Sequence, residues 1–555
     1  MKVLYIYGGN KNKLHNLGED CKVFLYRVGM GNIDEDNVLS INNSSLLNNI
    51  ATNSAKDYCE FIYSINKLFL KNNVVYNSKY SLYFIGDISG KRTEIFNTYS
   101  NFCNSLFIKD WLLSNDVDKV IFDSCRADLY KSISSILKGV GVNTECIDNK
   151  KKNNWYSRAL FSNVVFFANV LLGLLFKKIF IKKTKKKLSV IKNIFLTRFP
   201  LHLNWKLDED KYGELAGKDD FYLVNLFTDG MHQKVSFINY VKYSLFLRDK
   251  KNIIVLDDFI KVIDIMRAFI FSIAVINKYK HISSLRYSHN GVDLSENIGE
   301  ELLLSYIRST RLLMYLKPIY RLTNHYTISN LYYYLHEYSY GKLFTLGFKI
   351  NSPDTCLVGF QHGPSSKRKL LYMAANEESS ISADYLNSFP IPDKVLSEDS
   401  LSAQIYKDAG YSGVSLMGKI FRLKYLVDID RSMLDSKCVL IAPGLHDGEF
   451  MMEVLKSKIT NNDNMKFILK PHPRANNNYI NQYDALVNLE VSVSPIAHLL
   501  SKVSSVYVTY SSVAIEAKIL DINIEMVELP GSINESPLLD DEFSKSVLSM
   551  KQRIY

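Results

Sequence analysis

The stretches MKFILKPHPR at 465–474 and SSVYVTYSSVAIEAKIL at 504–520 decide the fold predicted for this chain. Each contains an apolar run that is too short for a helix and is typical of a buried strand. Each run ends at a polar turn, and ligands in open α/β sheets bind outside the carboxyl ends of the strands. We therefore expect one crevice to hold the side chains of Lys470, His472, Arg474, Ser511 and Ser512.

A helix over Val513–Leu520 is predicted directly after the two serines. The N-terminus of a helix carries free N–H groups and about half a positive charge, which suits a phosphate. The imidazole of His472 can carry a proton near neutral pH. A histidine, two cations and a helix start together indicate a cradle for the phosphate of a nucleotide.

The bulk composition is that of a globular protein. The chain has 555 residues, of which 47% are apolar, and this length predicts two or three domains. The seven cysteines are scattered and never spaced as CxxC, which indicates a reducing compartment and argues against a disulfide or zinc framework. The N-terminal MKVLYIYGGN is typical of a first strand rather than a signal peptide. We therefore expect a cytoplasmic protein.

The net charge of +11 belongs to one segment of the chain. Residues 150–187 contain eleven Lys or Arg and no Asp or Glu, so the rest of the chain sums to zero. A basic groove for nucleic acid is therefore not predicted.

An apolar run, Ala159–Phe176, lies inside this basic segment and is interrupted by Ser162, Asn163 and Asn169. Three interpretations are open: a spanning helix, which needs about 20 apolar residues, a buried core helix, or an amphipathic helix lying in the membrane interface. We favour the interfacial helix, because anionic lipid would attract each flanking lysine by roughly 1 kcal/mol. Trp155 would then be an interfacial anchor, together with Tyr156. The expected membrane-binding lysines are Lys177, Lys178, Lys182, Lys183, Lys185, Lys186 and Lys187.

Alternating strands and helices over 1–149 predict a doubly wound parallel sheet. Among its expected strands are 3–7, 81–87 and 119–124. The alternation resumes after residue 188, and no GxGxxG motif marks a dinucleotide site. The aromatic stretch LYYYLHEYSYGKLF at 331–344 predicts a helix. The apolar stripe at 266–276 is more typical of core than of membrane, because Arg267 interrupts it.

We therefore predict an α/β chain with two Rossmann-like domains that face a cleft. The first would span 1–425, hold the acceptor and contain the inserted basic helix at 150–187. The second would span 434–535 and hold the nucleotide donor. The tail at 536–555 is predicted to be helical and would return to the first domain.

The ordered motifs QHGP at 361–364, KPHP at 470–473 and SSVAIEA at 511–517 resemble a known group of enzymes. These are bacterial surface-polysaccharide glycosyltransferases of the GT-B architecture that use CMP-activated acidic sugars, namely nonulosonates of the sialic acid type and Kdo. The same order of motifs is similar to that of the CDP-glycerol glycerophosphotransferases of teichoic acid synthesis. The resemblance covers about 331–537, and residues 1–330 match only in the rhythm of strands and helices.

The resemblance implies a role for several residues. His472 and Pro473 would contact the cytidine monophosphate of the donor, and Ser511 and Ser512 would bind its phosphate. His362 would lie on the first-domain side of the cleft. A catalytic carboxylate is also implied, but Asp447-Gly448-Glu449 resembles the acidic element of polysialyltransferases only in scrambled order. The catalytic base and the stereochemical outcome therefore stay open.

Each donor-side candidate also has an ordinary structural interpretation. His472 can be a turn histidine, the cations can form surface ion pairs, and the serines can cap the helix. Glu516 can bind ribose hydroxyls or face solvent. Gly444, which follows the apolar run KCVLIAP, would let the backbone approach a phosphate closely.

The candidates for general acid or base work are His362, Glu337, Asp447 and Glu449. His362 follows an expected strand, and Glu337 lies among tyrosines that would raise the pKa of its carboxyl group. Asp447 and Glu449 equally suit the start of a helix, where acidic groups are favoured. A surface carboxylate is the alternative for Glu337.

No metal site and no cofactor are predicted. The sequence has no HExxH, and the pairs Asp219-Asp220 and Asp257-Asp258 lack a third ligand. Basic groups and a helix end would stabilise the leaving phosphate instead.

The predicted function is transfer of an acidic sugar from a CMP-sugar to a lipid-linked or growing surface glycan, as in O-antigen, lipopolysaccharide or capsule synthesis. The enzyme would bind the anionic inner face of the cytoplasmic membrane and no nucleic acid. Two alternatives remain: a CDP-glycerol glycerophosphotransferase, and a non-catalytic membrane scaffold for polysaccharide enzymes.

Overall fold

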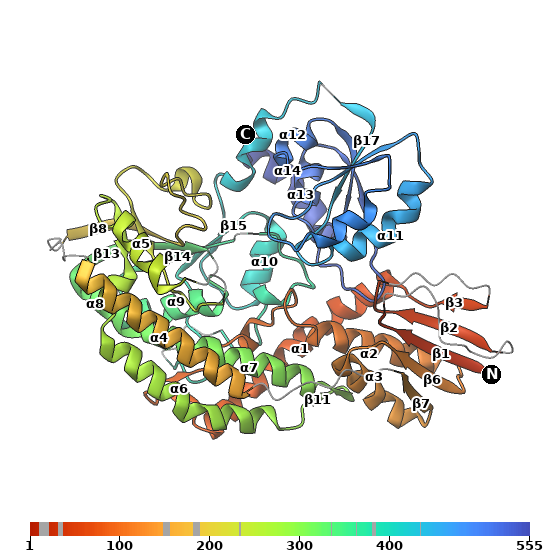
Figure 1. Cartoon of the computed structure of the whole chain (residues 1–555), viewed down its shortest axis with the longest axis horizontal. Helices are drawn as coiled ribbons and strands as arrows, with labels where there is room; N and C mark the ends of the chain where they lie inside the picture. The colour runs from red at the N-terminus through yellow and green to blue at the C-terminus, as the bar shows by residue number, and fades with distance from the viewer. Residues whose placement is uncertain are drawn as a thin grey trace.

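The protein is described by a computed structural model. It describes residues 1–9, 21–30, 37–147, 156–180, 189–231, 235–334, 336–361, 363–379, 384–432 and 434–554. The described chain is built on three parallel sheets, each with its own helices (Figure 1).

The first sheet has the strand order β3-β2-β1-β6-β7, and every neighbouring pair is parallel. Its strands are β1 (Lys2–Tyr7), β2 (Lys22–Arg27), β3 (Val38–Ser40), β6 (Lys119–Asp123) and β7 (Asn143–Ile147). The helices of this part are α1 (Ser44–Lys71), α2 (Thr98–Leu113) and α3 (Ala127–Val140). A small antiparallel ribbon joins β4 (Val75–Tyr76) to β5 (Tyr80–Ser81).

The second sheet has the order β10-β9-β8-β13-β14-β15-β16 and is also parallel throughout. Its strands are β8 (Ser189–Thr197), β9 (Phe221–Val224), β10 (Ile253–Val255), β13 (Tyr326–Tyr334), β14 (Cys356–Phe360), β15 (Lys394–Ser397) and β16 (Val414–Leu416). Its helices are α4 (Tyr156–Phe180), α5 (Phe237–Leu247), α6 (Val262–Ser283), α7 (Ser295–Leu312), α8 (Leu316–His325), α9 (Ser339–Asn351) and α10 (Ser400–Asp408). A short ribbon pairs β11 (Ser288–His289) with β12 (Val292–Asp293).

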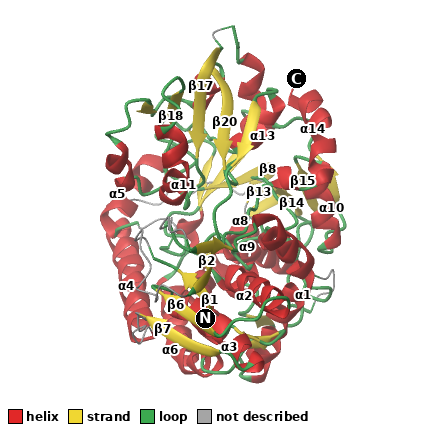
Figure 2. Cartoon of the chain, turned by 90° about the vertical axis from the view of Figure 1, so that its right-hand side faces the viewer, coloured by secondary structure: helices red, strands yellow, loops and turns green. Residues whose placement is uncertain are grey.

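The third sheet has the order β19-β18-β17-β20-β21 and is parallel (Figure 2, top). Its strands are β17 (Asp435–Ala442), β18 (Lys466–Leu469), β19 (Leu489–Val491), β20 (Val503–Val508) and β21 (Asn523–Met526). The helices that follow are α11 (Gly448–Thr460), α12 (Ile496–Leu500), α13 (Val513–Ile519) and α14 (Asp541–Ile554). Helix α14 contacts α13 of this part and α10 of the second, so the tail joins the two.

The predicted fold class, α/β with parallel Rossmann-like sheets, is confirmed. The range 1–425, however, holds two sheets, so the pair that the sequence predicted consists of the second and third sheets. Residues 1–147 form a further α/β part that the sequence did not separate.

Two predicted elements are wrong for one physical reason. Residues 82–87, expected in a strand, form a buried turn that leads into η1 (Ile88–Gly90). The helix expected over 331–344 is divided, because its first residues end β13 and α9 begins only at Ser339. A short buried aromatic run has no hydrophobic periodicity that distinguishes a strand from a turn or a helix. The residues of β13 form a strand because they pair with β8 and β14.

Helix α4 is part of the helical layer of the second sheet rather than a separate insertion. It packs against α5, α6 and α7. The two asparagines that interrupt its apolar run point inward. Asn163 donates to Ser272 Oγ and Thr310 Oγ1 at 3.0 Å each, and Asn169 donates to the Val235 carbonyl at 2.6 Å. The inward face of α4 therefore combines buried apolar side chains, such as Phe167 and Val170, with these two asparagines.

Candidate functional site

The carboxyl ends of β18, β17 and β20 lie side by side, because these strands are parallel neighbours. The turn after β18 carries Lys470 and His472, and the turn after β20 leads to Ser511 and Ser512. Adjacent strands lie about 4.8 Å apart, so the two turns that flank β17 are separated by roughly 10 Å. The structure therefore brings the two halves of the predicted cradle to one edge.

His472 presents one defined ring nitrogen to solvent. Its Nδ1 accepts a hydrogen bond from the backbone N–H of Arg474 at 3.2 Å, which leaves the proton of the neutral ring on Nε2. Burial, followed by the charges of Arg474 and His446, lowers the pKa of His472 below its ordinary value. The half-buried imidazole is therefore a neutral N–H donor at physiological pH. Pro473 and Arg474 are exposed and Lys470 is half-buried at the same turn.

The turn after β17 is closely packed around Gly444. A Cβ at this position would lie 2.6 Å from the ring of Tyr510 and 3.0 Å from Asp447 Oδ1, so only glycine fits. The Asp447 carboxylate accepts a hydrogen bond from the Thr509 hydroxyl, and burial raises the pKa of Asp447. Asp447 precedes α11 but does not cap it, and Glu449 is exposed in the first turn of that helix.

The two serines do not act as ordinary caps. Ser512 is at the N-cap position of α13, yet its hydroxyl makes no capping bond. Ser511 Oγ accepts from the Val513 N–H at a long 3.4 Å. The helix therefore does not use the Ser512 hydroxyl as a cap. Both serine side chains are half-buried.

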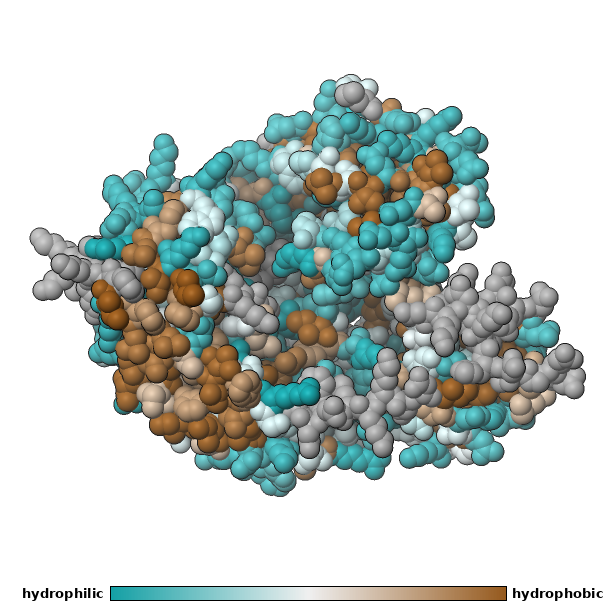
Figure 3. Space-filling model, viewed as in Figure 1, coloured by the Kyte–Doolittle hydropathy of each residue, from teal (hydrophilic) through white to brown (hydrophobic). Residues whose placement is uncertain are grey.

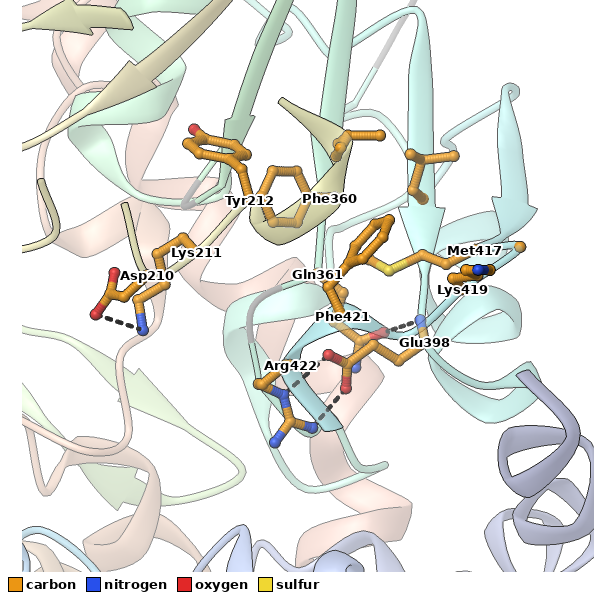
Figure 4. Close-up of a pocket in the computed structure, with 13 residues that line it drawn as sticks. Asp210, Lys211, Tyr212, Phe360, Gln361, Glu398, Met417, Lys419, Phe421 and Arg422 are labelled. Atoms are coloured by element: carbon orange, nitrogen blue, oxygen red, sulfur yellow. Dashed lines mark hydrogen bonds and ion pairs between the residues drawn. The ribbon is translucent and has the colours of Figure 1, made fainter. Parts of the chain in front are cut away.

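The Glu516 carboxylate pairs with Arg422, which lies between the second and third sheets. It is buried, 3.8 Å from Arg422 Nη1, and its own pKa is raised by burial although Arg422 and Tyr425 oppose the rise. Arg422 also donates to Glu398 from Nε at 2.9 Å and from Nη2 at 2.6 Å (Figure 4). The carboxylate thus has partners within the protein, where the sequence suggested ribose or solvent.

A cavity of about 310 Å³ opens at the carboxyl ends of β14, β15 and β16, beside this ion pair. Its wall is largely apolar, and its charged lining consists of Lys419 and two ion pairs, Lys211 with Asp210 and Arg422 with Glu398 (Figure 4). The aromatic and aliphatic lining residues include Tyr212, Leu215, Phe360, Leu396, Met417 and Phe421.

The first-domain candidates lie elsewhere or outside the described residues. Glu337 follows β13 and is only 2% exposed. It accepts a hydrogen bond from the Tyr406 hydroxyl and lies 3.3 Å from Nε2 of the buried His336. The carboxylate is therefore enclosed rather than on a surface. His362 lies outside the described residues.

Sequence reasoning missed a group of side chains near Tyr510. The charges of Asp447, Glu535 and Glu94 all raise the pKa of the Tyr510 hydroxyl after burial, which places these carboxylates around it. Glu535 is half-buried on the segment after β21 and accepts a hydrogen bond from the Thr93 hydroxyl. Burial raises the pKa of Glu535 to about 7, while the charge of Lys369 opposes the rise. The sequence around Glu535 does not indicate its raised pKa, because the residues that surround its carboxyl group are far away in the chain.

Among the described residues no cluster of three His, Cys, Asp or Glu is placed to hold a metal ion. All seven cysteines are free. Lys177 is paired with Asp258, Lys178 is exposed at the end of α4, and the lysines at 182–187 lie outside the described residues.

No protein-family model matches the chain, and no curated protein matches it. Solved structures with a similar fold include UDP-GlcNAc 2-epimerase from Neisseria meningitidis bound to UDP-GlcNAc, with 9% identity and a TM-score of 0.33 over 66% of this chain and 94% of that one. CalG4, the calicheamicin glycosyltransferase, has 11% identity and a TM-score of 0.33 over 66% and 94%. The wall teichoic acid polymerase TagF has 11% identity and a TM-score of 0.29 over 72% and 90%. Likenesses this distant carry no inference about activity, so the function is inferred from this chain's own residues.

Proposed function

We propose that the protein is a glycosyltransferase that moves an acidic sugar from a CMP-sugar to a surface glycan or its lipid-linked precursor. One observation carries the proposal: the turns that hold His472 and Ser512 flank β17 at one edge of the third sheet, and within the described part of the chain the fold does not use the His472 Nε2–H or the Ser512 hydroxyl. This edge suits a phosphate, because an imidazole N–H and a hydroxyl can both donate hydrogen bonds to its oxygens.

The leaving group would be a nucleoside monophosphate. CMP carries less charge than a nucleoside diphosphate, and this edge offers neutral donors together with the cations Lys470 and Arg474. Preorganised donors of this kind stabilise charge that develops on a leaving phosphate. No metal or cofactor is part of this proposal.

Glu535 is the best-placed general base. With a pKa of about 7, it is ionised in about half of the molecules at neutral pH, which suits proton transfer. In the proposed step the acceptor oxygen bonds to the anomeric carbon of the donor sugar while the bond from that carbon to the phosphate oxygen breaks. Glu535 takes the proton of the acceptor hydroxyl, and CMP leaves with the bonding electrons.

The outer face of α4 and its neighbours would keep the enzyme at the inner face of the cytoplasmic membrane. Tyr156–Ile179 is the one helix in the described ranges that is long and apolar enough to span a membrane, but Asn163 holds it to α6 and α7. Phe161 and Ile179 on α4 are 69% and 73% exposed, and Ile270 on α6 is 59% exposed. The apolar patch at lower left in Figure 3 covers these helices. The sequence assigned α6 to the core, yet its outer face is part of this patch.

An apolar face gains free energy when it leaves water for the bilayer interface, and the neighbouring lysines are attracted to anionic lipid. The residues at 182–187 add five lysines directly after α4. We therefore propose an interfacial contact made by several helices, and not by α4 alone.

The test is incubation of the full chain with CMP-sialic acid, CMP-Kdo, CDP-glycerol and UDP-sugars, with release of the nucleotide as the readout. Release of CMP from an acidic-sugar donor supports the proposal. Release from CDP-glycerol alone would assign the chain to glycerophosphate transfer. Absence of nucleotide binding to any donor, measured by thermal shift, would favour the scaffold and contradict the proposal.

A further inference from the structure

Arg198 follows β8 directly and is 5% exposed, yet it forms no ion pair and its guanidinium donates no hydrogen bond within the described part of the chain. Its carbonyl is used, because it accepts from the N–H of His202 at 2.9 Å and of Leu203 at 3.1 Å. Its side chain lies over the ring of Tyr340, 4.9 Å from the centroid. A guanidinium has five N–H donors, and leaving a buried charge without a partner is costly.

Other polar groups beside Arg198 are also unused. The Tyr340 hydroxyl and the Nδ2 of Asn225 are buried and lack a hydrogen-bond partner among the described residues, whereas the Oδ1 of Asn225 accepts from the Thr228 N–H at 2.9 Å. Asn225 follows β9 and Tyr340 lies in the first turn of α9, so three separate elements converge here. Thr228, in the same turn as Asn225, adds a buried hydroxyl without a partner. All of these groups can donate, and the carboxylates of Asp229 and Asp257 also act on the Tyr340 hydroxyl. An acceptor that binds here would therefore bind mainly through Arg198.

The cluster lies at the carboxyl edge of the second sheet, next to the cavity of Figure 4. The charge of Arg198 acts on the Tyr334 hydroxyl at the end of β13. The Tyr334 ring lies 5.6 Å from that of Tyr212, which lines the cavity. The edges of open α/β sheets are where ligands bind. Arg198 does not line the cavity, but Tyr334 and Tyr212 link it to the cavity wall.

We propose that Arg198, with Tyr340 and Asn225, binds an anionic group, a carboxylate or a phosphate, of the acceptor. Arginine binds either group through two parallel hydrogen bonds, and burial strengthens such a contact. The word acceptor rests on the proposed function, whereas anion binding at Arg198 does not. The acceptor would then be an acidic sugar or a sugar phosphate, and not a neutral glycan.

The probes are inorganic phosphate, N-acetylneuraminic acid and the methyl ester of that acid, titrated into the full chain by calorimetry. We expect the acid and phosphate to bind and the neutral ester not to bind. Arg198→Gln should weaken both anions at least tenfold, and Arg198→Lys should weaken them less. Arg286→Gln, which removes an exposed arginine, is the matched control and should change nothing.

Tyr340→Phe separates a binding role from a structural one. This hydroxyl has no hydrogen-bond partner among the residues that the structure describes, so removing it should leave the unfolding temperature equal or higher. The same variant should weaken anion binding several-fold. Loss of stability with unchanged anion binding would overturn the proposal, as would equal affinity for the acid and its ester.

CMP distinguishes the source of the anion. If N-acetylneuraminic acid binds equally well with CMP present, the site belongs to the acceptor. Displacement of the acid by CMP would move the site to the donor and overturn the assignment. If CMP itself does not bind, the proposed function fails, but the phosphate and acid titrations still decide the role of Arg198.

Discussion

The carboxyl edges of the second and third sheets differ in how their polar groups are held. At the third sheet, His472, Ser511 and Ser512 are half-buried and follow the strand ends within a few residues. At the second sheet, Arg198 and Glu337 are almost fully buried among tyrosines from several elements. One edge is open and local in sequence, and the other is enclosed and assembled from distant segments.

This difference indicates a division of labour. Half-exposed neutral donors can bind and release a nucleotide at little desolvation cost. Buried charges bind strongly and specifically, because an unsatisfied group in a low-dielectric site gains most from its ligand. The second edge therefore suits selection of the proposed acceptor, and the third suits binding and release of the proposed nucleotide donor.

Glu535, which lies between the two edges, gives the largest expected effect. Glu535→Gln should lower kcat/KM by about a thousandfold, in the range of lost general-base catalysis. In the wild type kcat/KM should rise as pH passes through about 7, because the carboxyl group must lose its proton to act as a base. The variant should lose this rise. Glu528→Gln, at an exposed position seven residues earlier, is the control and should keep both rate and profile.

The same carboxyl group affects stability in a defined direction. Burial favours the neutral form of the Glu535 carboxyl group and raises its pKa. Its contribution to the free energy of unfolding is therefore complete at acid pH and is lost as pH rises through about 7. Glu535→Gln should therefore be relatively more stable than the wild type above pH 7, measured by thermal unfolding at pH 5 and pH 8. A variant that loses stability equally at both pH values would contradict this.

His472→Ala tests the open edge. Loss of one preorganised donor to a developing phosphate charge should lower kcat by about a hundredfold and weaken CMP binding. Stability should change little, because the side chain is half-buried and bonds only to its own turn. His498→Ala, on the exposed α12 of the same part, is the control. Sugar transfer at the wild-type rate by His472→Ala would contradict the proposal that the third sheet binds the donor.

Arg422 tests the contact between the two edges. Arg422→Met would leave Glu398 and Glu516 buried without their common cation, which should cost about 2 to 4 kcal/mol of the free energy of unfolding. Lys424→Met is the matched control, because Lys424 pairs with Glu214 on the exposed surface two residues away. That pair should be worth less than about 1 kcal/mol. Equal effects in denaturant unfolding would show that the network does not join the domains.

The membrane face should give the smallest effect. Phe161→Asp combined with Ile270→Asp should weaken binding to anionic vesicles about tenfold, because two partly inserted apolar side chains are lost. The control exchanges two exposed apolar residues of the third part, Val487→Asp with Leu548→Asp. Equal loss in both double variants, measured by vesicle sedimentation, would mean that net charge alone drives binding.

The strands of the third sheet were predictable because their signals are local. Runs such as KCVLIAP and MKFILK are apolar over one strand length, and each ends at the turn that carries the site. Glu337 was predicted as a candidate but on the wrong element, since its aromatic neighbours fit strand and helix equally well. The apolar run of α4 identified a special helix, but not that Asn163 would point inward.

The amino-acid sequence by itself determined the parallel α/β class and the positions of the polar turns after the strands, because both depend on periods of a few residues. Only the tertiary structure decided which turns lie at one edge, which carboxylates lose contact with water, and that Arg198 forms no ion pair within the described residues. These properties depend on residues that are hundreds of positions apart, such as Thr93 and Glu535. Burial and long-range pairing set the free energy of each charge, and no local pattern records them.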